Sequence, residues 1–548
     1  MDMLFAYCYN VHIRMPFSTR KVGNNMCIDN NKCKYLSVLA ANPESARRCH
    51  ALAGRPTQEH NVVPNSYRDI FMSDRDRILY CKSFLRLSGK TQVYAPSSGD
   101  HQRTRLTHTL EVSQIARTIS QALNLNCNLT EAIALGHDIG HTPFGHAGEQ
   151  MLHEIMSPKK ENNYNAPKRT TIYELTKDEE EIYQPLYGFK HNLQSVRCLV
   201  EDLESRRNLY GLDLTNYTLW GIMHHSSLTY KNGKVSTENL VPYFYNRYLP
   251  YCNKELDVPA WSFEALVVAE ADEIAQMHHD LEDAIRRKAV TKEKIISILK
   301  NLYDLMDNVD KDTINRLEQE KWVPKEYLIA KTSKVIVNTL VSTLLKSSHE
   351  NLYNLIEKYK SKEFKADATE EEKLAVYFEA AKEVFKKCYK DPEIVSAIGY
   401  DIYADNTTRN TNIIRDFQST ISKAVINTFD VQRSDSKGKY IIKNLFEAYN
   451  TNPQQLPDSA LKNLYKILKA DGFDFTDHSI IDNNQEFFNI ESDELRDVIN
   501  DAVSRIRFED PKTGKDKRRD ILIMRIICDY IAGMTDSFAI SEYEKLYG

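Results

Sequence analysis

The chain has 548 residues, of which 42% are hydrophobic and 27% charged, and its formal net charge is -5 at pH 7. These values are typical of a globular protein with a large buried core, and they exclude a chain whose overall positive charge recruits nucleic acid. Ten cysteines occur without a CxxC pair, so we expect reduced thiols rather than a zinc finger. The N-terminal apolar run at 3–7 is short, and no stretch approaches the ~20 apolar residues of a membrane span. We therefore expect a soluble, cytoplasmic protein with no membrane partner.

Residues 1–65 are predicted to form an irregular N-terminal arm, because Asn-rich and Pro/Gly-punctuated stretches interrupt their sequence. From residue 66 onward, apolar residues recur at helical spacing for most of the chain. Alternating apolar and polar residues, which would indicate strands, occur mainly in short runs at 234–237 and 438–442. The sequence therefore predicts an all-α fold.

Polar stretches divide the helical part of the chain. Residues 157–184 combine a Ser-Pro start with Lys-, Asn- and Glu-rich runs, which is typical of an inserted loop rather than a core helix. Further polar stretches lie at 405–412 and 510–520, and we interpret the basic run within the second as a solvated loop. The expected units are a core at 66–290, interrupted by the inserted loop, and a helical C-terminal region at 291–548.

Residues 103–112 (RTRLTHTLEV) begin the first of four segments in which titratable residues accompany apolar periodicity. Apolar residues follow at steps of four or five, as on one face of an amphipathic helix: Leu106, Leu110, Ile115, Ile119 and Leu123. Arg105 and His108 are three residues apart and share a face. A cation beside a potential metal ligand suits an anionic substrate, whereas an ordinary core or surface histidine is the alternative.

The second segment, residues 128–146, contains three histidines and an aspartate within ten residues. Asn128 and Glu131 predict a capping-box start for a short helix, and the glycine and proline that follow predict its end near residue 140. His137 and Asp138 then fall in the last helical turn, where both can reach an ion that lies beyond the helix end. This density of ligand-type residues indicates a functional site.

The third segment contains His146 and Glu149, three residues apart at the start of the next predicted helix. A carboxylate that holds an imidazole is a common arrangement for proton transfer. An ordinary surface pair would explain the same spacing if the His137–Asp138 pair were not nearby.

The fourth segment, residues 265–280, predicts a helix with two different faces. Asp272, Gln276 and Asp280 recur every four residues and form a polar line along one side. Acidic side chains on a face that packs against protein need partners. We interpret a metal as the partner of Asp272 and a sugar hydroxyl as the partner of Asp280, and a solvent-facing acidic stripe is the alternative.

Four residues from these segments form a candidate metal-binding set: His108, His137, Asp138 and Asp272. Two imidazoles and two carboxylates suit Mn, Fe, Co, Ni or Zn, and they suit Mg less well because Mg prefers oxygen ligands. Four protein ligands leave octahedral positions for water and a phosphate oxygen. An open coordination sphere of this kind is typical of a catalytic rather than a structural site.

The motifs together resemble those of the dGTPase-like deoxynucleoside triphosphate triphosphohydrolases, a family of the HD-domain superfamily. The matching strings begin, in chain order, at Lys90 (KTQV), Arg103 (RTRLTH), His137 (HDIGHTPFGHAGE), Gly188 (GFKHNLQS), Glu270 (EADEIA) and Asp529 (DYIAGMTD). They span about residues 67–290 and the last 25 or so, and their number and order make the resemblance specific. The closing string implies that the end of the chain packs back on the core.

The resemblance implies a helical HD-domain core that hydrolyses deoxynucleoside triphosphates (dGTP or dNTPs generally) to deoxynucleoside and triphosphate. It implies one divalent metal, Mn, Mg or another first-row transition metal, held by His108, His137, Asp138 and Asp272. It assigns acid/base chemistry to His146 with Glu149, and a catalytic role in contact with the phosphates to His141. The substrate-binding positions that it implies are Arg105 and His191 at the phosphates, and Gln92, Gln276 and Asp280 at the sugar.

The chain departs from the family pattern at two positions. Gln276 stands where the family often has a tyrosine packed beside the deoxyribose, and Glu273 stands where aspartate is common. Neither change removes a residue of the proposed chemistry, but both bear on sugar or base preference.

Family members form oligomers, so a tetramer or hexamer is expected, and a nucleotide effector and single-stranded nucleic acid are further candidate partners. The closest alternative function is that of another HD enzyme, either a nucleotide phosphodiesterase or a guanosine tetraphosphate hydrolase. The latter group usually has a Glu-Asp pair soon after its HD pair, and cyclic-dinucleotide enzymes carry a Gly-Tyr-Pro signature; neither follows His137–Asp138 here. An alternative outside the enzymes is a protein that senses nucleotides or binds single-stranded nucleic acid and keeps only a vestigial site. The intact set of metal ligands argues against this alternative.

Overall fold

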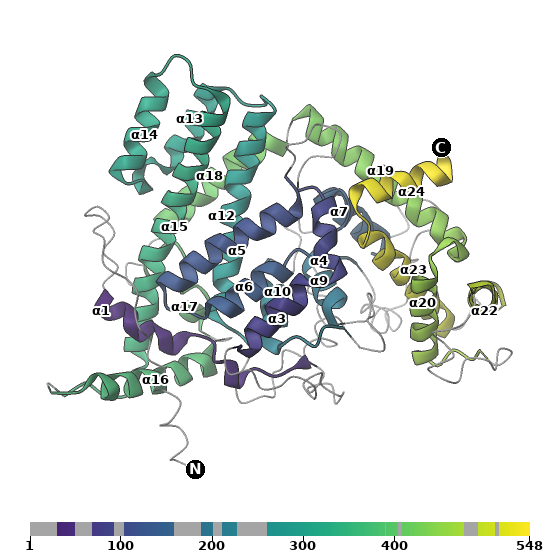
Figure 1. Ribbon diagram of the computed structural model, residues 1–548, viewed down its shortest axis with the longest axis horizontal. Coiled ribbons are helices and arrows are strands. Elements are labelled where there is room, and N and C mark those ends of the chain that lie inside the picture. Colours follow the sequence, from purple (N-terminus) through teal and green to yellow (C-terminus); the bar gives the residue numbers. More distant parts are fainter. Residues whose placement is uncertain are drawn as a thin grey trace, which may run out of the picture.

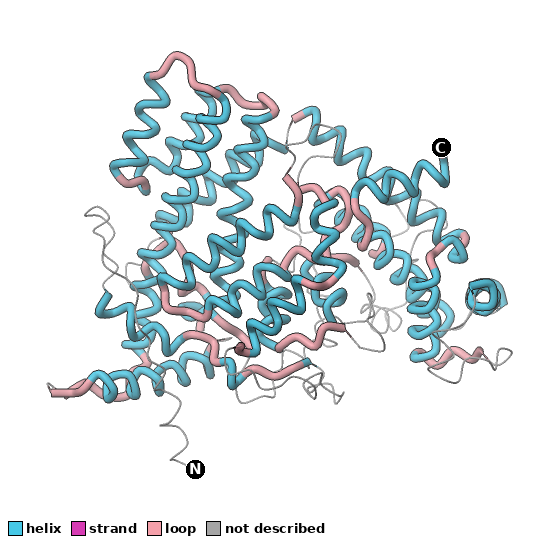
Figure 2. Tube along the Cα trace, viewed as in Figure 1, coloured by secondary structure: helices cyan, strands magenta, loops and turns pink. Residues whose placement is uncertain are grey.

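The computed structural model describes residues 30–49, 68–92, 103–157, 188–200, 211–226, 260–365, 367–388, 391–403, 408–426, 428–475, 492–509 and 514–548. Within these ranges the chain consists of helices and connecting turns and contains no β-strand (Figures 1 and 2). This confirms the predicted all-α fold. The inserted loop predicted at 157–184 lies, apart from Ser157, outside the described residues, and so does the strand candidate at 234–237.

The α-helices of the N-terminal half are α1 (Asn30–Cys33), α3 (Ile70–Leu79), α4 (Lys82–Arg86), α5 (Arg105–Ala122), α6 (Cys127–Gly136), α7 (Gly145–Ile155), α9 (His191–Val200), α10 (Asn216–His224) and α12 (Phe263–Arg286). Those of the C-terminal half are α13 (Lys292–Leu299), α14 (Asn308–Gln319), α15 (Lys325–Lys358), α16 (Glu370–Lys387), α17 (Pro392–Val395), α18 (Arg409–Ile426), α19 (Phe429–Thr451), α20 (Asp458–Ala470), α22 (Ser492–Ser504), α23 (Gly514–Ala532) and α24 (Asp536–Tyr547). Short 3₁₀ turns are η1 (Lys34–Leu39), η2 (Pro43–Ser45), η4 (Leu87–Gly89), η8 (Lys300–Leu305) and η10 (Pro453–Gln455), and η12 (Arg505–Glu509) is a π-type turn.

The centre of the molecule is a bundle in which α5 packs against both α6 and α12, while α3 packs on α6 (Figure 1). The buried face of α5 runs through His108, Val112, Ile115 and Ile119. Leu110, which we expected on this face, is 50% exposed. It lies two residues from the buried Val112, and two residues along a helix correspond to a rotation of about 200°, so Leu110 points away from the buried face. The buried face of α5 therefore combines an apolar stripe with a histidine at its N-terminal end.

The start of α6 differs from the sequence prediction by two residues. Asn126 is the cap, and its side-chain oxygen accepts hydrogen bonds from the backbone N–H groups of Asn128 and Leu129, both at 3.1 Å. The Asn128 side chain, predicted to be the cap, instead donates to Asp69 Oδ2 at 2.8 Å. Asparagine caps helices well at either position, so the tertiary contact with Asp69 decides the boundary.

A second apolar core lies beside the central bundle and joins α7 to the C-terminal helices α19, α20, α22, α23 and α24. Figure 1 shows these C-terminal helices together on the side of the molecule opposite α15 and α16. The strand prediction for 438–442 is wrong, because these residues lie inside α19. Ile441, Ile442 and Leu445 are buried there at helical spacing, so the short alternation in the sequence is part of a longer helical pattern.

Polar contacts tie the C-terminal helices to the segments that carry the ligand-type residues. The Asp529 carboxylate in α23 accepts from Arg197 Nη2 at 2.6 Å and from Gln194 Nε2 at 3.1 Å, both in α9. The buried Asp536 carboxylate at the start of α24 accepts from the Thr91 hydroxyl and from the Phe144 backbone N–H. The last part of the chain therefore contacts both α9 and the loop that leads into α7.

Residues 30–49 differ from the irregular arm that we predicted. Leu36 and Leu39 in η1 are fully buried and belong to the central apolar core. Arg48 forms a buried ion pair with Asp74 of α3, and Asp74 also accepts from the Thr215 hydroxyl at 2.6 Å. Asparagines and prolines mark turns in this stretch, but its apolar residues anchor it. The rest of the predicted arm, 1–29 and 50–65, lies outside the described residues.

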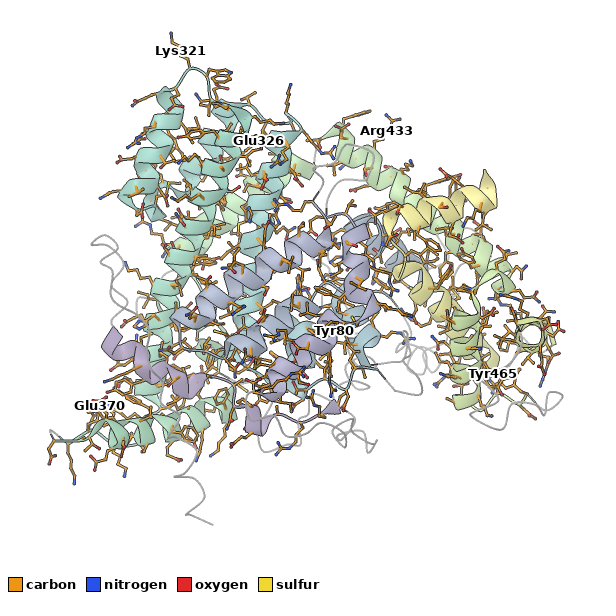
Figure 3. The ribbon with its side chains drawn as sticks, viewed as in Figure 1. Tyr80, Lys321, Glu326, Glu370, Arg433 and Tyr465 are labelled. Carbon is orange, nitrogen blue, oxygen red and sulfur yellow. The ribbon has the colours of Figure 1, made fainter. Side chains whose placement is uncertain are left out.

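Helix α15 is long and packs against α14, which in turn packs against α13, and Lys321 lies at the outer end of this group of helices (Figure 3). Among the described helices, α15 alone has the length and composition that a membrane span requires, which we did not expect from the sequence. Half of its most apolar window is buried inside the protein, where α15 packs against α12, α14 and α16. A core helix of a soluble protein has the same properties.

Candidate metal centre

The His137–Asp138 pair lies where α6 ends, at Gly136, so both side chains leave the helix at its C-terminal end. The His137 ring lies with Nδ1 2.6 Å from the backbone oxygen of Ala134. Because a carbonyl oxygen only accepts, Nδ1 carries the proton and Nε2 carries a lone pair. His137 is fully buried, and Nε2 has no hydrogen-bond partner among the described residues. A buried lone pair of this kind needs a cation or a donor nearby.

Three further side chains surround His137 Nε2. Asp138 Oδ1 lies 3.5 Å from it and Asp272 Oδ1 lies 3.7 Å from it. His108 Nε2, from the N-terminal end of α5, lies 2.9 Å from the same Asp272 oxygen. The structure thus brings together the four predicted ligands from α5, the end of α6 and α12. Ligand atoms of His108, His137 and Asp138 lie within 4.8 Å of one another.

The charge state of the carboxylates fits a divalent cation. Burial would raise the pKa of Asp138, but the neighbouring His141, His137 and Arg105 outweigh burial and hold the pKa well below its usual range. Burial likewise opposes ionisation of Asp272, but the neighbouring His108 and His137 lower its pKa. Two ionised carboxylates and two imidazoles form a nitrogen and oxygen donor set that suits a first-row transition metal. The residues present therefore fit the expected metal.

Positive and neutral donors also contact both carboxylate oxygens of Asp138. Arg105 Nη1 lies 2.9 Å from Asp138 Oδ2, and His141 Nε2 lies 3.1 Å from Asp138 Oδ1. Arg105 is almost fully buried, and its Nε and Nη2 atoms have no hydrogen-bond partner among the described residues. Unsatisfied guanidinium donors in the interior are costly. Two guanidinium donors beside Asp138 are therefore available to an anionic group.

Glu149, at the second turn of α7, accepts from more groups than the sequence predicts. His191 Nδ1 lies 2.9 Å from Glu149 Oε2, whereas His146 Nδ1 lies 3.6 Å away. Lys190 Nζ lies 3.2 Å from the other carboxylate oxygen. Burial opposes ionisation of Glu149, but the charge of His191 and the hydrogen bonds from His146 and His191 hold its pKa well below the usual range. The predicted His146–Glu149 pair is thus part of a larger group that includes His191.

His141 and His146 occupy different environments within this group. The His141 ring is buried and stacks on the His191 ring, with centroids 3.9 Å apart. Burial and the charge of Arg105 lower the pKa of His141 well below its usual range, so its imidazole is neutral when no anion is bound. The His146 side chain is 69% exposed. His146 therefore lies at the rim of the site, where a bulky substrate can reach it.

The three predicted sugar-binding residues come from two places. Gln276 and Asp280 follow Asp272 at one-turn and two-turn steps along α12 and share its face. Gln92 lies shortly after η4, and its Oε1 is buried without a hydrogen-bond partner among the described residues. Burial and the neighbouring Asp283 raise the pKa of Asp280 to about 7, while the charge of His146 opposes this. Asp280 thus lies within electrostatic range of His146.

The raised pKa of Asp280 predicts a pH-dependent gain in stability for Asp280→Asn. The carboxyl group of Asp280 ionises near pH 4 in the unfolded chain but near pH 7 in the fold. Folding stability should therefore fall as the pH rises from about 4 to about 7, since the unfolded chain loses its proton first. Asparagine stays neutral, so its advantage should grow from near zero at pH 4 to about 1–3 kcal/mol at pH 8. Urea unfolding at both pH values measures this, and an advantage that is independent of pH would contradict it.

Sequence reasoning missed several residues that the fold brings to the site. His225, which follows α10, places Nε2 3.2 Å from His191 Nε2. Burial, together with the neighbouring His137 and His191, lowers the pKa of His225 to about 3. His279 of α12 and Glu111 of α5 lie behind His108. His225 and His279 each follow another histidine directly in the sequence. These His-His pairs are the sequence signal from which the two residues could have been predicted.

Two glycines allow the backbone to approach closely around the site. A Cβ on Gly140 would lie 2.2 Å from the Ser195 backbone nitrogen, so only glycine lets the loop after Asp138 pack on α9. The Gly140 N–H also donates to the Ser195 hydroxyl at 2.8 Å. Gly145 has a φ of +57° and begins α7 directly after Phe144, which also has a positive φ. These contacts fix His141 and His191 relative to Asp138.

Comparison with known proteins places these residues in a wider group. A family described as the HD domain matches residues 105–230, and one described as the phosphohydrolase-associated domain matches residues 495–545. A Rickettsia felis protein named deoxyguanosinetriphosphate triphosphohydrolase-like protein is 30% identical over 491 residues, which cover 89% of this chain and 94% of the relative. A protein of the same name from Bartonella henselae is 30% identical over 519 residues, which cover 93% and 95%.

Proposed function

Because the chain belongs to the deoxyguanosinetriphosphate triphosphohydrolase-like family of HD-domain proteins, we propose that it hydrolyses deoxynucleoside triphosphates. The products of the proposed reaction are a deoxynucleoside and intact triphosphate, and a divalent metal is required. The main support is the lone pair of His137 Nε2, which has no hydrogen-bond partner in the described part of the chain and which His108, Asp138 and Asp272 surround. A metal bound there would polarise the phosphorus centre that water attacks.

The anionic substrate is expected to bind beside Asp138. Arg105 offers two buried donors, Nε and Nη2, that have no partner within the described ranges, and a triphosphate oxygen would satisfy them. The same negative charge would offset the effect of Arg105 on His141 and restore the affinity of that imidazole for a proton. His191, held by Glu149 and stacked on His141, extends the row of donors. This row matches a chain of phosphates rather than a single phosphate group.

The leaving 5′-oxygen needs a proton near neutral pH, and His146 is the proposed donor. Its ring is exposed at the rim, and its Nδ1 faces the ionised Glu149 carboxylate. A carboxylate in this position accepts from Nδ1–H and stabilises the imidazolium form of the ring, whose Nε2–H is the proton given to the leaving oxygen. Asp280, Gln276 and Gln92 are proposed to contact the sugar. A closely packed sugar site would reject a 2′-hydroxyl by crowding, which favours deoxynucleotides.

The reaction itself tests the proposal. The full-length protein is incubated with Mn²⁺ and each of the four dNTPs, and the products are separated by anion-exchange chromatography. We expect deoxynucleoside and tripolyphosphate in equal amounts from at least one dNTP, and much less product from the matching ribonucleotide. Stepwise release of single phosphates would mean that a different bond is cut, and no turnover of any dNTP would remove the proposed function.

Replacing His146 with alanine is expected to slow turnover by about 100-fold, the lower end of what a general acid contributes. Because His146 is 69% exposed and outside the proposed ligand set, the variant should keep its metal and its melting temperature. Single-turnover rates and metal content measured on the same sample check both expectations. A variant that loses metal together with activity would place His146 in the metal site rather than at the leaving group.

A further inference from the structure

A second row of side chains lies behind His108, on the side away from Asp272. His108 Nδ1 lies 3.1 Å from Nδ1 of His279, and His279 Nε2 is hydrogen-bonded to the Glu111 carboxylate. Glu111 and His108 are three residues apart on α5, and His279 follows Asp272 by seven residues on α12. Each pair therefore shares one helix face. Both histidines are buried, whereas the Glu111 side chain is 41% exposed, so the row runs from the surface to the metal centre.

The direction of each hydrogen bond in this row follows from simple chemistry. A carboxylate only accepts, so Nε2 of His279 carries the proton that binds Glu111. A neutral imidazole has one N–H, which leaves a lone pair on Nδ1 of His279 to accept from Nδ1–H of His108. His108 then carries a lone pair on Nε2, the atom that lies 2.9 Å from Asp272 Oδ1. The lone pairs of His108 and Asp272 thus point to one cation position.

We propose that Glu111 and His279 are positioning residues that fix the tautomer of His108 and aim its Nε2 lone pair at the metal. The inference rests on the proposed function, because it takes His108 and Asp272 as ligands of the cation. Outer partners of metal-bound histidines commonly contribute 10–100-fold to metal affinity. Here the partner of the ligand is a second histidine, which a partly exposed carboxylate holds in turn.

Glu111 and His279 also lie close enough together to form a separate cation site, which His278 would complete. The charges around Glu111 argue against that reading. Glu111 Oε2 already accepts from His279, lies 3.3 Å from His278 Nε2, and lies 3.2 Å from Arg103 Nη1. A cation at this oxygen would face the guanidinium of Arg103. The geometry instead favours a hydrogen-bonded row in which Arg103 and His278 support the carboxylate.

Titration of the metal-free full-length protein with Mn²⁺ tests the proposal without relying on activity. Glu111→Leu removes the acceptor and is expected to weaken Mn²⁺ binding by about 10–100-fold. Glu111→Gln keeps an acceptor oxygen and should recover part of this loss. Glu282→Gln is the matched control, because Glu282 also binds Arg103, at 2.8 Å, but does not belong to the row; its affinity should stay within about two-fold of the parent protein.

A double variant separates a row that acts in series from two independent contributions. His279→Phe alone should weaken binding about as much as Glu111→Leu, and the two changes together should weaken binding no further, since either one releases His108. Unchanged affinity in Glu111→Leu, or losses that add, would overturn the proposal. The proposal would also be overturned if the parent protein bound a second Mn²⁺ and Glu111→Leu by itself abolished this second binding. A parent protein that binds no Mn²⁺ would remove the proposed function and this inference with it, whereas normal binding in all variants would remove the inference alone.

Discussion

Replacing Asp138 with asparagine is expected to abolish metal binding and to reduce dNTP turnover by about 10³-fold or more, since a catalytic metal contributes several kcal/mol to the transition state. Asparagine has nearly the same shape but carries no charge. The cation would then lose one of its two carboxylates, and Arg105, which lies 2.9 Å from Asp138 Oδ2, would lose its counter-charge. Metal content after dialysis and initial rates with saturating dNTP measure the two effects.

Asp416→Asn provides the control for this substitution. Asp416 is an exposed carboxylate on α18, so the same chemical change there should alter neither metal content nor rate. The proposed metal centre would be contradicted if Asp138→Asn kept both its full metal content and its full activity. Loss of activity with full metal content would instead mean that Asp138 acts on substrate through Arg105 and His141 rather than on the metal.

Replacing Asp529 with alanine is expected to lower the free energy of unfolding by about 3–5 kcal/mol, the usual effect of removing one partner of a buried ion pair. Asp529 accepts from Arg197 Nε and Nη2 at 3.0 and 2.6 Å and from Gln194 at 3.1 Å, and the side chains of Asp529 and Arg197 are both about 95% buried. The variant would keep the guanidinium in the interior without this carboxylate. Urea unfolding followed by circular dichroism measures the change.

The comparison variant for this prediction is Asp501→Ala on α22. Asp501 also pairs with an arginine, Arg505, but its side chain is 44% exposed and the pair lies one turn apart on the surface. Exposed pairs of this kind contribute about 0.3–0.5 kcal/mol. A loss below about 1 kcal/mol in Asp529→Ala would show that α9 and α23 are held together by their apolar contacts rather than by this pair.

The four proposed metal ligands could be found from the sequence because each depends on local spacing. His137 and Asp138 are neighbours at a helix end, His108 lies at the start of an amphipathic pattern, and Asp272 begins a polar line along one helix. Helical periodicity is a strong signal in single sequences, and it also predicted the all-α fold. The positions of the ligand-type residues can therefore be predicted largely from the spacing of residues within single helices.

The partners of those ligands could not be found in the same way. Whether His279 faces His108, or His225 faces His191, depends on how α12 packs on α5 and how α10 packs on α9. Helix packing sets such contacts through the shapes of both surfaces, and no spacing within one helix encodes them. The start of α6 shows the same limit on a smaller scale, since a contact with Asp69 draws Asn128 away from the cap.

The contacts of Asp536 with Thr91 and Phe144 have a consequence for how the enzyme is made. Asp536 follows Thr91 by 445 residues and Phe144 by 392 residues, and these partners border the loop that leads into α7. During synthesis the N-terminal part of a protein emerges and folds first. A nascent chain that has not yet reached Asp536 thus holds all four ligand-type side chains but lacks the contacts that this residue makes with Thr91 and Phe144.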